Sequence, residues 1–203
     1  MGCMLHGFHV IFSTYGFRLP NDPRGSWSDW IRNWELLQFG PATKVETRRS
    51  VAGAKHDVAL RKRAKEALRF PEVLLSGPQA QAAGLGFRAA VEEADYAIYA
   101  CSILPQHVHL VIGPHERDID RIVGHLKARA TQAMNAAGLH PLGAHREADG
   151  TVPSPWCRRC WKVFIFSQRH LREAIQYVED NPLKAGKQRQ NWSFVTPRVR
   201  RPR

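Results

Sequence analysis

Residues 105–112 read Pro105-Gln106-His107-Val108-His109-Leu110-Val111-Ile112, with two histidines one position apart in an apolar run. Successive side chains of a β-strand point to opposite faces. The stretch therefore predicts a strand with His107 and His109 on one face and a purely apolar opposite face that can pack on a core. The two imidazoles would then lie a few ångströms apart, a spacing that suits chelation of a metal ion.

The rest of the chain predicts an α+β fold. Alternating apolar residues indicate strands over 8–13, 96–103 and 161–166, and a last short strand over 192–195. Helical spacing behind capping residues predicts helices over 57–70, 76–94, 117–137 and 167–180, the last halted by Pro182. A short helix after Ser26 or Ser28 would carry a stripe of tryptophans. This order suits an antiparallel sheet with helices packed on it and a helical insertion between the first and second strands.

The length of 203 residues suits a single domain, which we place at residues 1–196. Residues 28–95 form a mostly helical insertion in this scheme, and residues 197–203 form a basic disordered tail. No apolar run is long enough for a membrane span, and the N-terminus lacks the pattern of a signal peptide. Four cysteines in a chain of this length do not indicate a secreted disulfide framework, so we expect a cytoplasmic protein.

Positive charge is concentrated near the end of the chain. The formal net charge is +12, and residues 157–203 hold 12 Lys or Arg against 3 acidic residues. Such a concentration is typical of a nucleic-acid partner, although a solubilising surface with a disordered tail is the alternative. Trp156 and Trp161 interleave with these cations, which suits base stacking and equally suits a core position. The candidates for DNA contact are Arg158, Arg159, Arg169, Arg172, Lys184 and Lys187.

The last predicted helix carries a tyrosine and an asparagine on its flank. Its core face begins at Leu171, and Tyr177 and Asn181 lie one turn apart beside that face. A hydroxyl and an amide placed there can be presented together to an adjacent strand. Because Asn181 precedes Pro182, its backbone is expected to leave the helix and its side chain to turn inward. A partly buried tyrosine beside a helix-stop asparagine explains the same spacing.

Two kinds of histidine site do not fit the pair. A histidine-triad nucleotide hydrolase needs a third alternating histidine, where this chain has Val111. A zinc metalloprotease needs histidines four positions apart on a helix, with an intervening glutamate. Cys157 and Cys160 form a single Cys-x-x-Cys without a second pair, which is weak support for structural zinc.

Two motifs resemble those of single-tyrosine transposases of the HUH endonuclease class, notably the REP-associated group. His107-Val108-His109 is similar to the HUH motif (histidine, hydrophobic, histidine), within a string like the group's P-x-H-V-H-L. Residues 177–186, Tyr-Val-Glu-Asp-Asn-Pro-Leu-Lys-Ala-Gly, resemble the group's second signature, Y-(I/V)-x-x-N-P-x-(K/R)-x-G. The resemblance covers most of residues 6–196, and Gln106 departs from it because relatives often carry Asn or Asp there.

The resemblance implies a ferredoxin-like α+β core and an enzyme that cleaves and rejoins single-stranded DNA. It makes Tyr177 the nucleophile that forms a 5′-phosphotyrosine, and it makes His107, His109 and Asn181 ligands of a divalent metal. Mixed nitrogen and oxygen ligands suit Mn²⁺, with Mg²⁺ as the alternative. The implied partner is single-stranded DNA that forms hairpins. We expect a monomer or a homodimer and no membrane partner.

Two alternatives remain open at this point. A DNA-binding protein on the same fold, specific for a sequence or a hairpin, would use the histidines structurally and would cleave nothing. A replication initiator or relaxase commonly adds a second tyrosine or a lysine-bearing tyrosine motif, and this chain offers one candidate, Tyr177.

Overall fold

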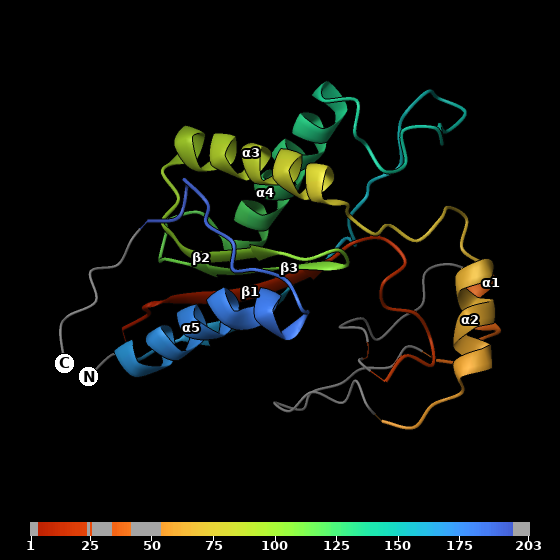
Figure 1. Ribbon diagram of the computed structural model, residues 1–203, viewed down its shortest axis with the longest axis horizontal. Coiled ribbons are helices and arrows are strands. Elements are labelled where there is room, and N and C mark those ends of the chain that lie inside the picture. The colour runs from red at the N-terminus through yellow and green to blue at the C-terminus, as the bar shows by residue number, and fades with distance from the viewer. Residues whose placement is uncertain (1–3, 24, 26–33, 42–53, 197–203) are drawn as a thin grey trace.

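The computed structural model describes residues 4–23, 25, 34–41 and 54–196 and has an α+β fold built on one antiparallel sheet (Figure 1). The strands lie in the order β2-β3-β1-β4, with bounds Gly7–Ser13 (β1), Ile98–Ile103 (β2), His107–Ile112 (β3) and Trp161–Ile165 (β4). The helices are Trp34–Leu37 (α1), Val58–Glu66 (α2), Gly77–Ala94 (α3), Ile119–Ala136 (α4) and Gln168–Lys184 (α5). The succession β1, α3, β2, β3, α4, β4, with β1 and β3 paired at the centre, is the ferredoxin-like arrangement that the family resemblance implies.

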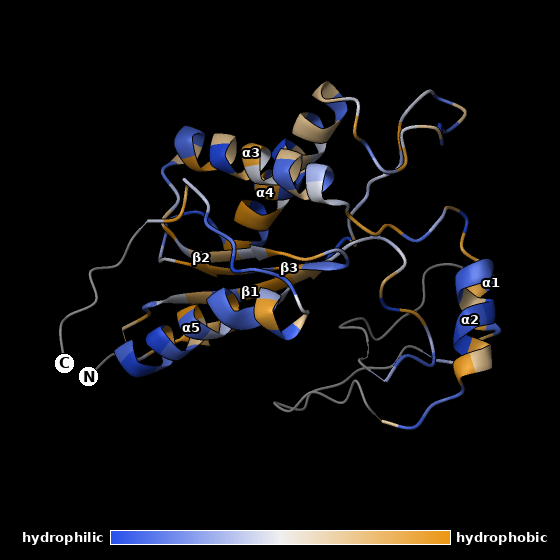
Figure 2. Cartoon of the chain, viewed as in Figure 1, coloured by the Kyte–Doolittle hydropathy of each residue, from blue (hydrophilic) through white to orange (hydrophobic). Residues whose placement is uncertain are grey.

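Different helices cover the two faces of the sheet. α3 and α4 pack together on one face, and α5 packs on the other against β2 and β3 (Figure 1). α1 and α2 lie to one side of the sheet and share a small apolar cluster with Leu19. α2 is mainly hydrophilic, whereas the sheet-facing sides of α4 and α5 are apolar (Figure 2). The range 28–95 therefore contains both this lateral part and α3, which belongs to the layered core.

Local signals define where the core helices begin. Ser76 caps α3 in a capping box with Gln79, and Pro78 occupies the first turn, where its missing N–H would be unpaired in any case. Asp118 and Ser167 cap α4 and α5 by accepting hydrogen bonds from backbone N–H groups of the first turn. These caps lie at or within two residues of the positions that the sequence predicts.

Gly86 allows α3 and α4 to approach each other closely. A Cβ atom at this position would lie 2.4 Å from the carbonyl oxygen of Arg129 and 2.5 Å from the Cα of Ala130. A side chain does not fit at these distances, so the two helices meet backbone to backbone. Beneath them lies the larger apolar core, in which the apolar face of β3 is fully buried.

The opposite face of β3 carries the histidines and receives residues from both neighbouring strands. Antiparallel pairing places His9 of β1 opposite Val111 and Ser102 of β2 opposite His109. Because directly opposite residues share a face of the sheet, His9 and Ser102 lie on the histidine face. α5 covers part of this face through a second apolar cluster that includes Ala100, Ile165, Leu171, Ala174 and Val178.

Some predicted element ends are wrong. α5 runs through Pro182 to Lys184, one turn beyond the predicted stop. Pro182 is buried, so tertiary packing holds this turn although proline removes one backbone N–H donor. α2 ends at Glu66 rather than at residue 70. Residues 192–195 form a single bridge, from Val195 to Ile98, instead of a strand.

Two predictions fall partly or wholly outside the described residues. The tryptophan stripe lies mostly within 26–33, and the basic tail is residues 197–203. None of the helices in the described part of the chain is long and apolar enough to cross a membrane.

Candidate functional site

His107 and His109 lie on the face of β3 that α5 partly covers, and His109 contacts α5 through Asn181 and Tyr177. Their ring centroids are 4.9 Å apart and their planes are inclined at 72°. His109 is buried, with 3% of its surface exposed, whereas His107 is partly buried. Phe17, in the loop that follows β1, stacks on the His107 ring with 5.4 Å between centroids. The predicted pair is therefore side by side and shielded on two sides.

A chain of hydrogen bonds passes through His109. Asn181 Nδ2 lies 3.1 Å from His109 Nε2, and His9 Nε2 lies 3.2 Å from His109 Nδ1. An amide nitrogen can only donate, so Asn181 donates to Nε2, and the ring proton of His109 is on Nδ1, which donates to His9. The tautomer is assigned from this network. It leaves the Nε2 lone pair of His109 directed toward α5.

His9 is a site residue that the sequence analysis missed. The strand over 8–13 is predicted from Phe8, Val10 and Phe12, which lie on one face. His9 lies on the opposite face and contributes nothing to that prediction. The missing information is that β1 lies next to β3, which the order of elements does not specify. In the structure the His9 and His109 rings are 5.5 Å apart and inclined by only 24°.

Tyr177 of α5 reaches the same group of rings. Its ring centroid is 5.6 Å from that of His9 and 5.7 Å from that of His109. Tyr177 is 43% exposed to solvent. Lys184, nearly two turns further along the helix, places its Nζ 4.1 Å from the centre of the tyrosine ring. Two turns of α5 thus present a hydroxyl, an amide and a cation beside the histidines.

Asn181 differs from its prediction in one respect. It lies inside α5 and is buried, and its backbone does not leave the helix before Pro182. Its side chain nevertheless points toward His109. Residues four positions apart lie on the same face of a helix, so Asn181 shares with Tyr177 the face of α5 that contacts His109.

Burial keeps the two inner imidazoles neutral at pH 7. Loss of hydration lowers the pKa of His109 well below its usual value, and electrostatic repulsion from His107, His9, Arg18 and Lys184 in their protonated forms lowers it further. Loss of hydration and the charge of His170 lower the pKa of His9 to about 4. Neutral imidazoles retain the lone pair that a metal ion requires.

The donor atoms suit a divalent ion. Two ligands that meet at right angles on one ion, each about 2.1 Å from it, lie about 3.0 Å apart, and the His109 and Asn181 nitrogens are 3.1 Å apart. Rotation of the Asn181 amide by half a turn would exchange Nδ2 for the oxygen that a hard cation prefers. Within the described residues no cluster of three His, Cys, Asp or Glu side chains could hold a metal ion. A metal at this position would therefore depend on His107, His109 and the amide of Asn181.

Most predicted DNA contacts lie away from this group. Arg169 and Arg172 are exposed on the first half of α5, where Arg169 pairs with Glu173, and Lys187 is exposed beyond the end of α5. Arg158 and Arg159 lie beside a pocket on the other face of the sheet. Lys184 alone among the six lies on the tyrosine ring.

The two tryptophans have different surroundings. Trp156 is buried in the larger core and donates from Nε1 to the hydroxyl of Thr131, so base stacking does not apply to it. Trp161 is partly exposed and its ring lies 5.7 Å from that of His9. Trp161 therefore borders the site.

Comparison with known proteins gave only structural matches. No protein-family model and no curated protein matches the chain. The structure of a REP-associated tyrosine transposase bound to a REP hairpin is similar over 92% of this chain and 72% of that chain, at 15% identity and a TM-score of 0.46. The structure of a "putative transposase" from Deinococcus radiodurans R1 is similar over 87% of this chain and 91% of that chain, at 14% identity and a TM-score of 0.45.

Proposed function

We propose that this protein is a metal-dependent single-stranded DNA endonuclease and transposase that cleaves and rejoins DNA through a 5′-phosphotyrosine. The observation that carries the proposal is the meeting of Tyr177 and Asn181 with the buried His109. Asn181 is 72 residues from His109 in the sequence. Asn181 and Tyr177, both on α5, nevertheless contact the same histidine of β3. Hairpin-forming repeats are the proposed target, on the basis of the two motifs.

His107, His109 and Asn181 would hold the divalent ion. When bound, such an ion supplies Lewis acidity at a phosphate and orients it. The role of His9 is to accept the hydrogen bond from His109 Nδ1, which fixes the tautomer whose Nε2 carries the lone pair. That lone pair accepts from Asn181 in this structure and would ligate the ion once the Asn181 amide has rotated. The buried, neutral state of both rings preserves this arrangement at pH 7.

Tyr177 is the proposed nucleophile. Its oxygen forms a bond to phosphorus, the bond between phosphorus and the 3′ oxygen breaks, and the phenol loses a proton while the departing 3′ oxygen gains one. One phosphate ester replaces another, so a 3′-hydroxyl can reverse the step and rejoin strands without ATP. The Lys184 ammonium lies over the tyrosine ring, where its positive charge attracts the phosphate.

A covalent-adduct assay tests the proposal. The protein is mixed with hairpin-containing single-stranded DNA and Mn²⁺ or Mg²⁺, and the product is separated under denaturing conditions. We expect an adduct from the native chain and from the matched control Tyr99→Phe, a tyrosine on the same sheet face, and none from Tyr177→Phe. An adduct from Tyr177→Phe would assign the nucleophile elsewhere.

The second candidate is a DNA-binding protein of the same fold that cleaves nothing. The hydrogen bond between Asn181 and His109 favours this candidate, because it pairs the polar atoms of both side chains without a metal ion. Retained hairpin binding with no adduct in any metal would establish this alternative and refute the first proposal.

A further inference from the structure

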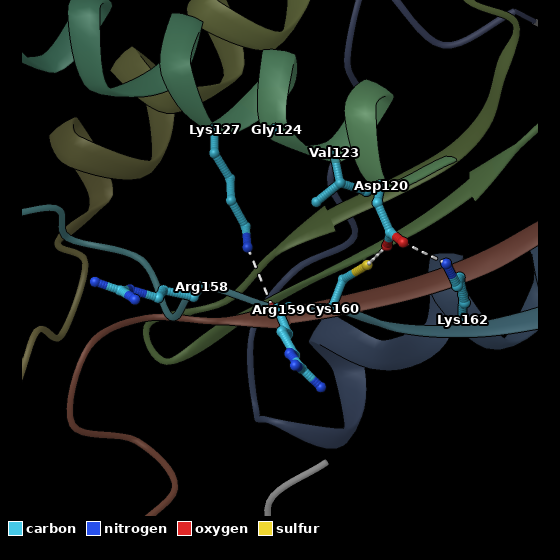
Figure 3. Close-up of a pocket in the computed structure, with 8 residues that line it drawn as sticks. All are labelled: Asp120, Val123, Gly124, Lys127, Arg158, Arg159, Cys160 and Lys162. Carbon is cyan, nitrogen blue, oxygen red and sulfur yellow. Dashed lines mark hydrogen bonds and ion pairs between the residues drawn. The ribbon is translucent and has the colours of Figure 1, made fainter. Parts of the chain in front are cut away.

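A second basic site lies on the sheet face opposite His107 and His109. It is a cavity of about 500 Å³ between α4 and the segment that leads into β4 (Figure 3). Four of its lining side chains are cationic and one is acidic, which gives a formal charge of +3. The lining residues are Asp120, Val123, Gly124, Lys127, Arg158, Arg159, Cys160 and Lys162.

Lys127 is the buried cation of this pocket. It is 9% exposed, and its Nζ donates to the carbonyl oxygens of Cys157 at 2.7 Å and Arg159 at 3.2 Å. An ammonium has three N–H donors, so these bonds leave one more. Among the described residues no carboxylate lies within ion-pair distance of Lys127. The ammonium also lies over the Phe12 ring, with Nζ 4.8 Å from the ring centre. A buried ammonium held by carbonyl dipoles and an aromatic face has no full counter-charge, and an anion in the pocket would supply it.

The acidic residue of the pocket is already neutralised. Asp120 accepts a hydrogen bond from Lys162 Nζ at 2.6 Å and a further one from Cys160 Sγ at 3.4 Å. The charge that remains for an incoming anion is therefore that of Lys127, Arg158 and Arg159. Neither guanidinium forms an ion pair with any residue in the described part of the chain.

The arrangement of these cations suits a chain of phosphates better than a single one. Figure 3 shows Arg158 and Arg159 extending in different directions from adjacent positions, with Lys127 reaching from α4 to the backbone of Arg159. Cations that spread in this way can contact successive phosphates of a nucleic-acid backbone. A pocket for one small anion would instead direct them to a common point.

We propose that this pocket binds the backbone of the same single-stranded DNA that the histidine site acts on, beyond the segment that lies at Tyr177. β4 borders both sites. Alternation in β4 directs Trp161 to His9 and directs its neighbours Cys160 and Lys162 into the pocket. A strand of DNA that crosses the edge of the sheet at β4 reaches both. The ligand, although not the site, rests on the proposed function.

The salt dependence of binding tests the pocket. Binding of a fluorescent single-stranded oligonucleotide is measured in metal-free buffer between 0.1 M and 1 M salt, so that no cleavage occurs. The slope of log K against log [salt] is negative, and the loss of two phosphate contacts reduces its magnitude by about 1.4. For Arg158→Ala/Arg159→Ala, the loss of affinity relative to the native chain should therefore grow about 25-fold between 1 M and 0.1 M salt.

The control is Arg88→Ala/Arg146→Ala, which removes the same charge from exposed positions on α3 and on the loop after α4. We expect this control to retain nearly the native slope. Lys127→Met should lower the slope by about 0.7, provided that circular dichroism shows it folded. The two-arginine variant keeps the test valid if Lys127→Met does not fold.

The outcomes separate the pocket from the proposed chemistry. A native slope in Arg158→Ala/Arg159→Ala overturns the pocket, and so does an equal loss of slope in the control. The proposal is also overturned if Arg158→Ala/Arg159→Ala loses binding of inorganic phosphate but keeps the native salt slope for DNA binding. The pocket is then a site for a small anion. If the native chain forms no adduct in any metal but the slope falls as expected, the pocket stands and the nuclease proposal fails.

Discussion

The hydrogen bond from Asn181 to His109 should contribute measurably to stability. Replacement of Asn181 by leucine keeps the number and branching of the side-chain heavy atoms and removes the donor, so the buried Nε2 of His109 is left without a partner. An unsatisfied buried acceptor costs about 1–3 kcal/mol. In a domain of this size each kcal/mol lowers the melting temperature by about 2–4 °C. We therefore expect Asn181→Leu to melt about 2–12 °C below the native chain in the absence of metal.

A double-mutant cycle separates the hydrogen bond from other effects of leucine. Urea unfolding is followed by circular dichroism for the native chain, Asn181→Leu, His109→Phe and the double variant. If the hydrogen bond is the cause, Asn181→Leu loses about 1 kcal/mol or more alone and much less in the His109→Phe background. The exposed control Asn135→Leu should change the unfolding free energy by less than about 0.5 kcal/mol. Equal losses in both backgrounds would refute the reasoning.

Three further predictions follow from other contacts. His9→Phe should weaken Mn²⁺ binding about 10- to 100-fold by calorimetry, because it removes the acceptor that orients His109; unchanged affinity would exclude this role. Gly86→Val should unfold at clearly lower denaturant concentration than Gly124→Val, because only the former meets backbone within 2.5 Å; equal midpoints would contradict the close packing of α3 on α4. Burial raises the pKa of the Cys160 thiol to about 11, helped by Asp120, so its alkylation by iodoacetamide should be slow at pH 8 and accelerate up to about pH 11. A rate that levels off near pH 9 would show an ordinary thiol.

The sequence predicts those parts of the site that depend on local periodicity. The alternation in β3 places His107 and His109 together and buries the opposite face, as the structure has it. Helical spacing puts Tyr177 and Asn181 on one flank of α5, and both face the histidine strand. The strand period of 2 and the helix period of 3.6 suffice for these predictions, because each prediction concerns only which side chains share a face of a single element.

What the sequence does not predict depends on contacts between elements. His9 enters the site because β1 pairs with β3, and Lys127 enters the basic pocket because α4 packs above the segment before β4. The sequence does not predict the end of α5 for a similar reason, since proline disfavours a helix locally and the burial of Pro182 outweighs that preference. Arg158 and Arg159 were predicted as DNA contacts from charge alone, without a face of the sheet to assign them to.

The two edges of the sheet differ, and this difference favours a DNA path over β4. The outer edge of β2 is occupied, because the Gln190 side chain bonds both backbone groups of Ile103 and the Thr196 N–H donates to the carbonyl of Ile98. β4 is paired only with β1 among the described strands, so its other edge has no strand beside it. Exposed strand edges are usually protected by charge or cover, and here Lys162 and the two arginines supply the charge. A polyanion that crosses this edge meets those cations on one face and Trp161, beside His9, on the other.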